Sequence, residues 1–127
     1  MIFELSPDAI FSLMLYIISF HSLCVGAALM ARPQKLMRRA GFASVNEPFF
    51  PVQGGMFHII MAVGYALAGA DLKFFAGLII FSIIVKMLAM IFLIGYYLMF
   101  ESKKIIFVSG VVDGVMGIFI LYGYMYL

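Results

Sequence analysis

Charged residues are scarce in this chain of 127 residues: they make up 11% of it, whereas hydrophobic residues make up 66%. Soluble domains carry about 25% charged and about 45–50% apolar residues. This deficit excludes an ordinary water-soluble fold, and the length limits the chain to one domain. Most of the chain must therefore lie in a lipid bilayer.

Cysteine and tryptophan are also nearly missing, with Cys24 as the one cysteine and no Trp at all. A single cysteine forms no disulfide within the chain, and the cysteine spacing of zinc sites is not there. The chain opens with acidic Glu4 and Asp8 and without an early Lys or Arg. A signal peptide needs a basic start, so we expect no cleavable signal here.

Four long apolar stretches dominate what is present. A spanning helix needs ~20 apolar residues to cross ~30 Å of hydrocarbon, and each stretch is long enough. Ser6-Pro7-Asp8 before the first stretch is typical of a helix start. The expected spans are residues 9–31, 50–70, 74–100 and 105–127. The sequence therefore predicts an all-α fold, a polytopic membrane four-helix bundle.

Basic residues are distributed unevenly between the connections of these spans. The second connection holds Lys73, whereas the third holds Lys103 and Lys104 and the first, the loop 32–49, holds four basic residues. Connections rich in Lys and Arg stay in the cytoplasm. We therefore predict that both basic connections are cytoplasmic and that both termini are non-cytoplasmic. The four basic residues of the first loop are Arg32, Lys35, Arg38 and Arg39.

This first loop alternates its basic residues with Leu36, Met37 and Phe42. One interpretation is a short interfacial helix whose four cations set the topology and contact anionic lipid headgroups. The other is a site for a phosphate-bearing lipid or substrate. The sequence does not choose between them.

Small residues indicate where the spans pack. Helices in lipid associate through close backbone approach, because the lipid is as apolar as Leu. Gly110, Gly114 and Gly117 form such a stripe in the fourth span, and Ser22 and Gly26 lie four residues apart in the first. We expect a compact bundle, and we expect Leu at the fourth-span glycines to separate the protein from its partners.

One ionisable residue stands out in each span: His21, His58, Lys86 and Asp113. A charge at mid-bilayer costs ~2.5–3.5 kcal/mol, so each one needs a reason. His21, His58 and Asp113 lie ~12–15 Å from the cytoplasmic helix ends at 1.5 Å per residue. Lys86 joins this layer if the third helix leaves the membrane near Tyr96.

Three interpretations of this polar layer remain open. Lys86 and Asp113 form an ion pair, hydrogen-bonded to one or both histidines, that fixes helix register. Alternatively the layer is a proton relay or a pocket for a polar headgroup, a quinone or a small substrate. In the third, His21 and His58 are the axial ligands of a haem or bind a metal.

No motif for catalysis accompanies these residues. The chain has no Gly-rich phosphate loop, nucleophile elbow, HExxH or paired carboxylates. We assign no catalytic residue and no cofactor, and we expect a non-enzymatic protein without a nucleic-acid partner.

The layout resembles small bacterial four-helix membrane proteins of the DoxX-like kind. The shared features are a first span ending in a basic stretch, a glycine-rich second span, a Lys in the third and an Asp in the fourth. Here they are Arg32-Pro33 through Gly41-Phe42, Gln53-Gly54-Gly55 with Gly64-Tyr65, Lys86, and Asp113-Gly114. The resemblance implies the same bundle, and some members of that group are small subunits of quinone-dependent redox systems.

These observations lead to a functional hypothesis. We expect an accessory or structural subunit of the bacterial cytoplasmic (inner) membrane, packed against other membrane proteins such as those of a respiratory or photosynthetic complex. The alternative is a small-molecule-binding membrane protein, for quinone- or haem-linked redox chemistry or for transport, that uses the intramembrane His, Lys and Asp residues.

Overall fold

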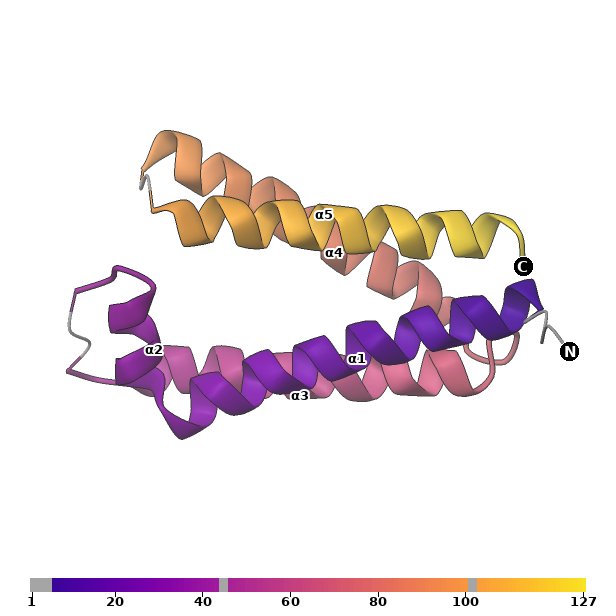
Figure 1. Ribbon diagram of the computed structural model, residues 1–127, viewed down its shortest axis with the longest axis horizontal. Coiled ribbons are helices and arrows are strands. Elements are labelled where there is room, and N and C mark those ends of the chain that lie inside the picture. Colours follow the sequence, from indigo (N-terminus) through magenta and orange to yellow (C-terminus); the bar gives the residue numbers. More distant parts are fainter. Residues whose placement is uncertain (1–5, 44–45, 101–102) are drawn as a thin grey trace, which may run out of the picture.

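The computed structural model describes residues 6–43, 46–100 and 103–127, and within them the chain forms five helices (Figure 1). Four are long: α1 (Pro7–Ala31), α3 (Phe49–Ala70), α4 (Ala76–Met99) and α5 (Lys104–Met125). A short helix, α2 (Pro33–Arg39), follows α1. The predicted all-α bundle is confirmed, and each predicted end of a span lies within two residues of the observed helix end.

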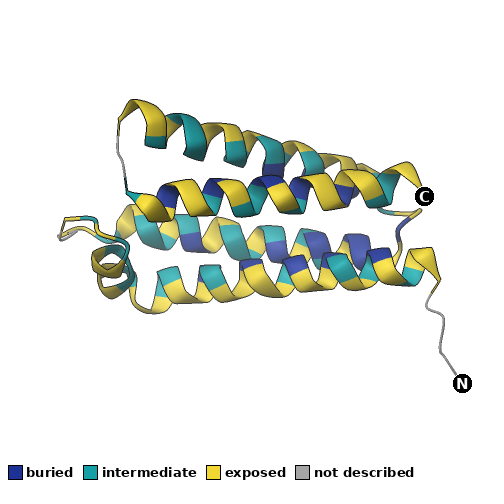
Figure 2. Ribbon diagram, turned by 45° about the horizontal axis from the view of Figure 1, so that its top comes forward, coloured by how far each residue is buried: buried dark blue, intermediate teal, exposed yellow. Residues whose placement is uncertain are grey.

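The long helices have the length and the surface of membrane spans. They contain 22 to 25 residues each, which at 1.5 Å per residue gives ~33–38 Å, enough to cross a bilayer. Their buried positions lie on the sides that face other helices, and their outer sides expose large apolar side chains (Figure 2). Lipid is the solvent that suits such a surface. The chain is a multi-pass integral membrane protein.

Local signals set the helix boundaries at the basic corner. Pro33 is the first residue of α2 and prevents α1 from continuing past Ala31. α2 ends in a Schellman motif: the Phe42 amide donates to the Met37 carbonyl and the Gly41 amide donates to the Arg38 carbonyl, both at 3.0 Å. Gly41 has φ of 87°, a conformation that costs glycine little. The predicted loop 32–49 thus contains a short helix, after which the chain makes a tight turn.

Helix α1 packs along α3 through small residues. A Cβ added to Gly26 would lie 2.6 Å from the carbonyl oxygen of Gly55, so the two backbones touch at this point. Closer to the start of α1, the Ser19 hydroxyl donates a 2.6 Å hydrogen bond to the Ala62 carbonyl of α3. Gly69 lies against the first turns of α1. These contacts make α1 and α3 a first pair of helices.

Helix α5 packs along α4 to make the second pair. The glycine stripe of α5 faces α4: Gly110 lies against Leu93 and Ile94, Gly114 against Met90, and Gly117 against Lys86 and Met87. The stripe is therefore buried inside the chain. These glycines lie at a contact between two helices of the chain, and the expected effect of Leu there on association with a partner stays a prediction. Such a change would separate α5 from α4.

The two pairs meet most closely near the chain ends. A cluster of buried apolar side chains from both pairs fills that end of the bundle, and it consists of Phe11, Leu15, Ile18, Tyr65, Ala68, Leu72, Ile79 and Ile120. From there the pairs diverge toward α2 (Figure 1). At the far end the Lys103 ammonium lies 4.9 Å from the Phe42 ring centroid.

Candidate functional site

Lys86 of α4 and Asp113 of α5 form an ion pair inside the second pair of helices. Lys86 Nζ donates to Asp113 Oδ1 at 2.5 Å. The exposed fractions of the two side chains are 5% and 16%. Gly117 of α5 lies beside the pair, and a Cβ there would lie 3.1 Å from Lys86 Cβ, closer than ordinary van der Waals contact. The pair places Lys86 at the depth of Asp113, in the predicted polar layer.

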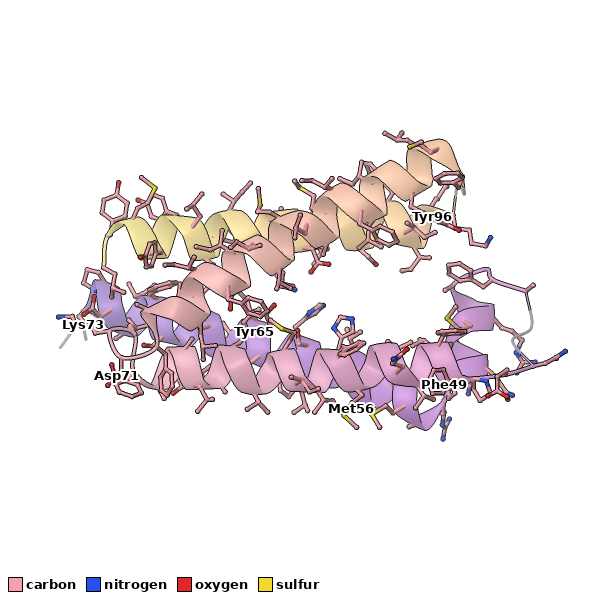
Figure 3. All side chains as sticks on the ribbon, turned by 180° about the vertical axis from the view of Figure 1, so that it is seen from behind. Phe49, Met56, Tyr65, Asp71, Lys73 and Tyr96 are labelled. Atoms are coloured by element: carbon pink, nitrogen blue, oxygen red, sulfur yellow. The ribbon has the colours of Figure 1, made fainter. Side chains whose placement is uncertain are left out.

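Tyr65 of α3 completes the surroundings of the lysine. Its ring centroid lies 5.5 Å from Lys86 Nζ, a cation–π contact, and its side chain is almost fully buried. Tyr65 lies on the side of α3 that faces α4 (Figure 3). The Lys86 ammonium thus lies between the Asp113 carboxylate, which belongs to the same pair of helices, and the Tyr65 ring, which belongs to the other pair of helices. Sequence reasoning missed this role of Tyr65, although a lone Tyr among the small residues of that span is a usable signal.

The two histidines belong to the first pair of helices, His21 to α1 and His58 to α3. His58 is half-buried and close enough to Lys86, Asp113 and His21 to interact with each of them electrostatically. Within the described residues, however, neither histidine hydrogen-bonds to the ion pair. The predicted hydrogen bonds to the pair are therefore wrong, while the predicted Lys86–Asp113 contact is present.

His21 is exposed and lines a groove between α1 and α5. The groove has a volume of about 470 Å³. Its other walls are apolar side chains from both helices: Met14, Ile17, Ile18, Val111, Val112, Val115, Met116 and Phe119. Cys24, one turn further along α1, is exposed but does not line the groove. The imidazole of His21 is the one polar side chain in this intramembrane wall.

The residues of the polar layer can perform a limited set of tasks. Lys86 and Asp113 neutralise one another, and the two imidazoles can donate and accept hydrogen bonds or carry a proton. In the part of the chain that the structure describes, no group of three or more His, Cys, Asp or Glu could hold a metal ion. His21 and His58 remain the two candidate haem ligands named from the sequence.

The predicted headgroup residues separate into two sets. Arg32, Lys35 and Arg39 line a small hollow at the corner between α1 and α2, whereas Arg38 lies outside it. All four are exposed. The sequence grouped them together because it shows charge but not the direction of a side chain.

Comparison with known proteins adds no relative. No family model, curated protein or solved structure matches this chain. What the protein does must therefore be inferred from its own residues.

Proposed function

We propose that this multi-pass protein is a non-catalytic accessory subunit of the bacterial cytoplasmic membrane, held against another membrane protein through the groove between α1 and α5. The proposal rests mainly on His21. His21 is exposed, is one of the residues that line the groove, and has no hydrogen-bond partner among the described residues. It lies ten residues from the end of α1 at Ala31, which is ~15 Å at 1.5 Å per residue.

An imidazole at this depth needs a polar partner. Hydrocarbon supplies none, and an unpaired polar group in it is costly. A lipid chain covers the apolar wall of the groove but leaves His21 unsatisfied. A transmembrane helix that carries one polar side chain covers the wall and pairs with the imidazole as well, as polar residues do between membrane helices. A partner helix therefore suits the groove better than lipid.

Site-specific photo-crosslinking in the native membrane tests this proposal. A photoreactive residue at Val115, in the groove, is compared with one at Ile91, an exposed position of α4 outside it. We expect one discrete crosslinked polypeptide from Val115, none from Ile91, and loss of the Val115 product when His21→Leu is added. A native mass of 14.2 kDa, or of its multiples alone, together with equal labelling at both positions, would overturn the proposal.

The orientation of the chain is part of the same proposal. The first turn of α1, the last turn of α5 and the turn at Asp71 and Lys73 lie at one end of the bundle, and α2 lies at the other (Figures 1 and 3). Because the basic residues gather at the α2 end, we place that end in the cytoplasm and both termini outside. In a Cys24→Ala background, an impermeant maleimide should label Lys73→Cys in intact cells and Arg38→Cys only after permeabilisation. The reverse pattern would invert the orientation.

A second candidate function has its own observation. Lys86, Asp113, Tyr65 and His58 form a polar layer where the two pairs diverge, which suits a small polar molecule such as a quinone headgroup. The DoxX-like resemblance agrees with either candidate, since small subunits of quinone-dependent systems occur in that group. Here Asp113→Asn should remove a bound quinone, detected by solvent extraction and mass spectrometry, while the Val115 crosslink persists. Retention of the quinone would count against this second function.

A further inference from the structure

The corner between α1 and α2 forms a hollow of about 180 Å³ lined by three cations. Lys35 and Arg39 lie four residues apart on one face of α2, and Arg32 is the residue directly before that helix. Ala28 and Ala31 of α1, with Leu36, supply the rest of the lining. The small alanine side chains leave the space open, and none of the acidic residues that the structure describes lines it. The volume is smaller than that of a drug-sized site and suits a single compact group.

The positive charge of this hollow is not neutralised by the part of the chain that the structure describes. The ion pair formed there is Lys86–Asp113, far from this corner, and none of the three cations hydrogen-bonds to a described carboxylate. Three exposed cationic side chains that line one small space attract an anion. Arginine side chains are well matched to phosphate oxygens, to which they can donate two parallel hydrogen bonds.

The position of the hollow indicates where such a phosphate would come from. Arg32 directly follows the last residue of α1, so the hollow lies where a membrane-spanning helix ends and where lipid phosphates are found. Its floor of Ala28, Ala31 and Leu36 is apolar, which suits the glycerol and upper acyl region of a lipid but gains nothing from free phosphate. We propose that this hollow binds the phosphate group of an anionic phospholipid, as a site independent of the groove and of the polar layer.

Arg38 offers a matched control for this proposal. It is on the same short helix and exposed like Arg39, but it does not line the hollow. Arg38→Gln and Arg39→Gln remove the same charge from the same loop, so they change the membrane-surface electrostatics and the topological signal equally. They differ in whether the hollow loses a cation.

The experiment measures lipid binding by the full chain with native mass spectrometry, titrating phosphatidylglycerol or phosphatidylcholine into the detergent-purified protein. We expect one phosphatidylglycerol to bind more tightly than phosphatidylcholine. Arg39→Gln should weaken it roughly tenfold, because a charge-assisted hydrogen bond to the phosphate is lost, whereas Arg38→Gln should leave it unchanged. Arg39→Lys, which retains the charge, should keep most of the affinity.

Three results would overturn the inference. Equal loss in Arg38→Gln and Arg39→Gln would show diffuse attraction to the whole basic segment in place of a site. Equal binding of phosphatidylglycerol and phosphatidylcholine would show that the hollow does not select an anionic lipid. Displacement of the lipid by an excess of inorganic phosphate would assign the hollow to a soluble phosphate compound. Unchanged helical content of each variant, measured by circular dichroism, ensures that the binding change is not a folding change.

Discussion

The Lys86–Asp113 pair allows the sharpest test of how this bundle is stabilised. Asp113→Asn leaves the Lys86 ammonium, whose side chain is 5% exposed, without its counter-charge, and Lys86→Met leaves the Asp113 carboxylate, which is 16% exposed. Removing one partner of a buried pair typically costs ~3–5 kcal/mol. We expect about 3 kcal/mol for each single change, because exposure of a side chain within a membrane span is exposure to hydrocarbon, which solvates neither charge.

The double variant is the decisive measurement. Without both charges no ion is buried alone, so we expect it to lose about 1 kcal/mol or less of unfolding free energy, well below the sum of the two single losses. The assay is equilibrium unfolding in mixed micelles of a mild detergent and dodecyl sulfate, followed by far-ultraviolet circular dichroism. Leu88→Met, at an exposed position of the same helix, controls for the methionine and should change little.

Two outcomes would refute this reasoning. If each single change costs less than about 1 kcal/mol, the pair behaves like an exposed salt bridge and is not desolvated. If the double variant loses the sum of the single losses, the two side chains do not interact in the folded protein. Either outcome would also count against the polar layer as the site of the second candidate function.

Three further predictions concern backbone contacts, and thermal unfolding in detergent measures each of them. Gly26→Ala should lower the free energy of unfolding by about 1–3 kcal/mol, because its Cβ would meet a carbonyl oxygen of α3 that cannot move aside. Gly54→Ala, which has nothing within 4 Å, should leave the free energy of unfolding unchanged or raise it by up to about 1 kcal/mol. Equal effects of the two changes would contradict the close approach of α1 and α3. Ser19→Ala should lose about 0.6 kcal/mol with its hydrogen bond to α3, and no loss would mean that this bond contributes nothing. Gly41→Ala should lose about 1 kcal/mol, because an L side chain is strained at φ of 87°, and a gain would contradict the helix end described for α2.

Prediction from sequence worked best where a strong physical rule acts on single residues. The start of α1 was predicted from Ser6-Pro7-Asp8, whose backbone preferences act locally. The four spans follow from the length of apolar chain that a bilayer requires. The identity of the two intramembrane charges was also clear, because any charge in such a span stands out.

The candidate site was only partly predictable. Two opposite charges in successive spans favour an ion pair, and the pair exists, but the expected hydrogen bonds to His21 and His58 do not form within the described residues. Tyr65 was missed as a neighbour of the lysine, because the rotation of α3, which decides which helix the ring faces, cannot be deduced from the sequence.

The sequence by itself determined that this chain crosses a membrane with four helices and that basic residues gather at one end. Whether a segment can cross the hydrocarbon depends on its length and apolar composition, and the cost of a charge there depends on the residue type. Only the tertiary structure decided which helices pair, that Gly55 faces α1 while Gly54 has no close neighbour, and that Arg39 lines a hollow that Arg38 does not. Those outcomes depend on helix rotation. Residues adjacent in the sequence point in directions about 100° apart on a helix, and only the packing of all the helices together fixes which direction faces inward.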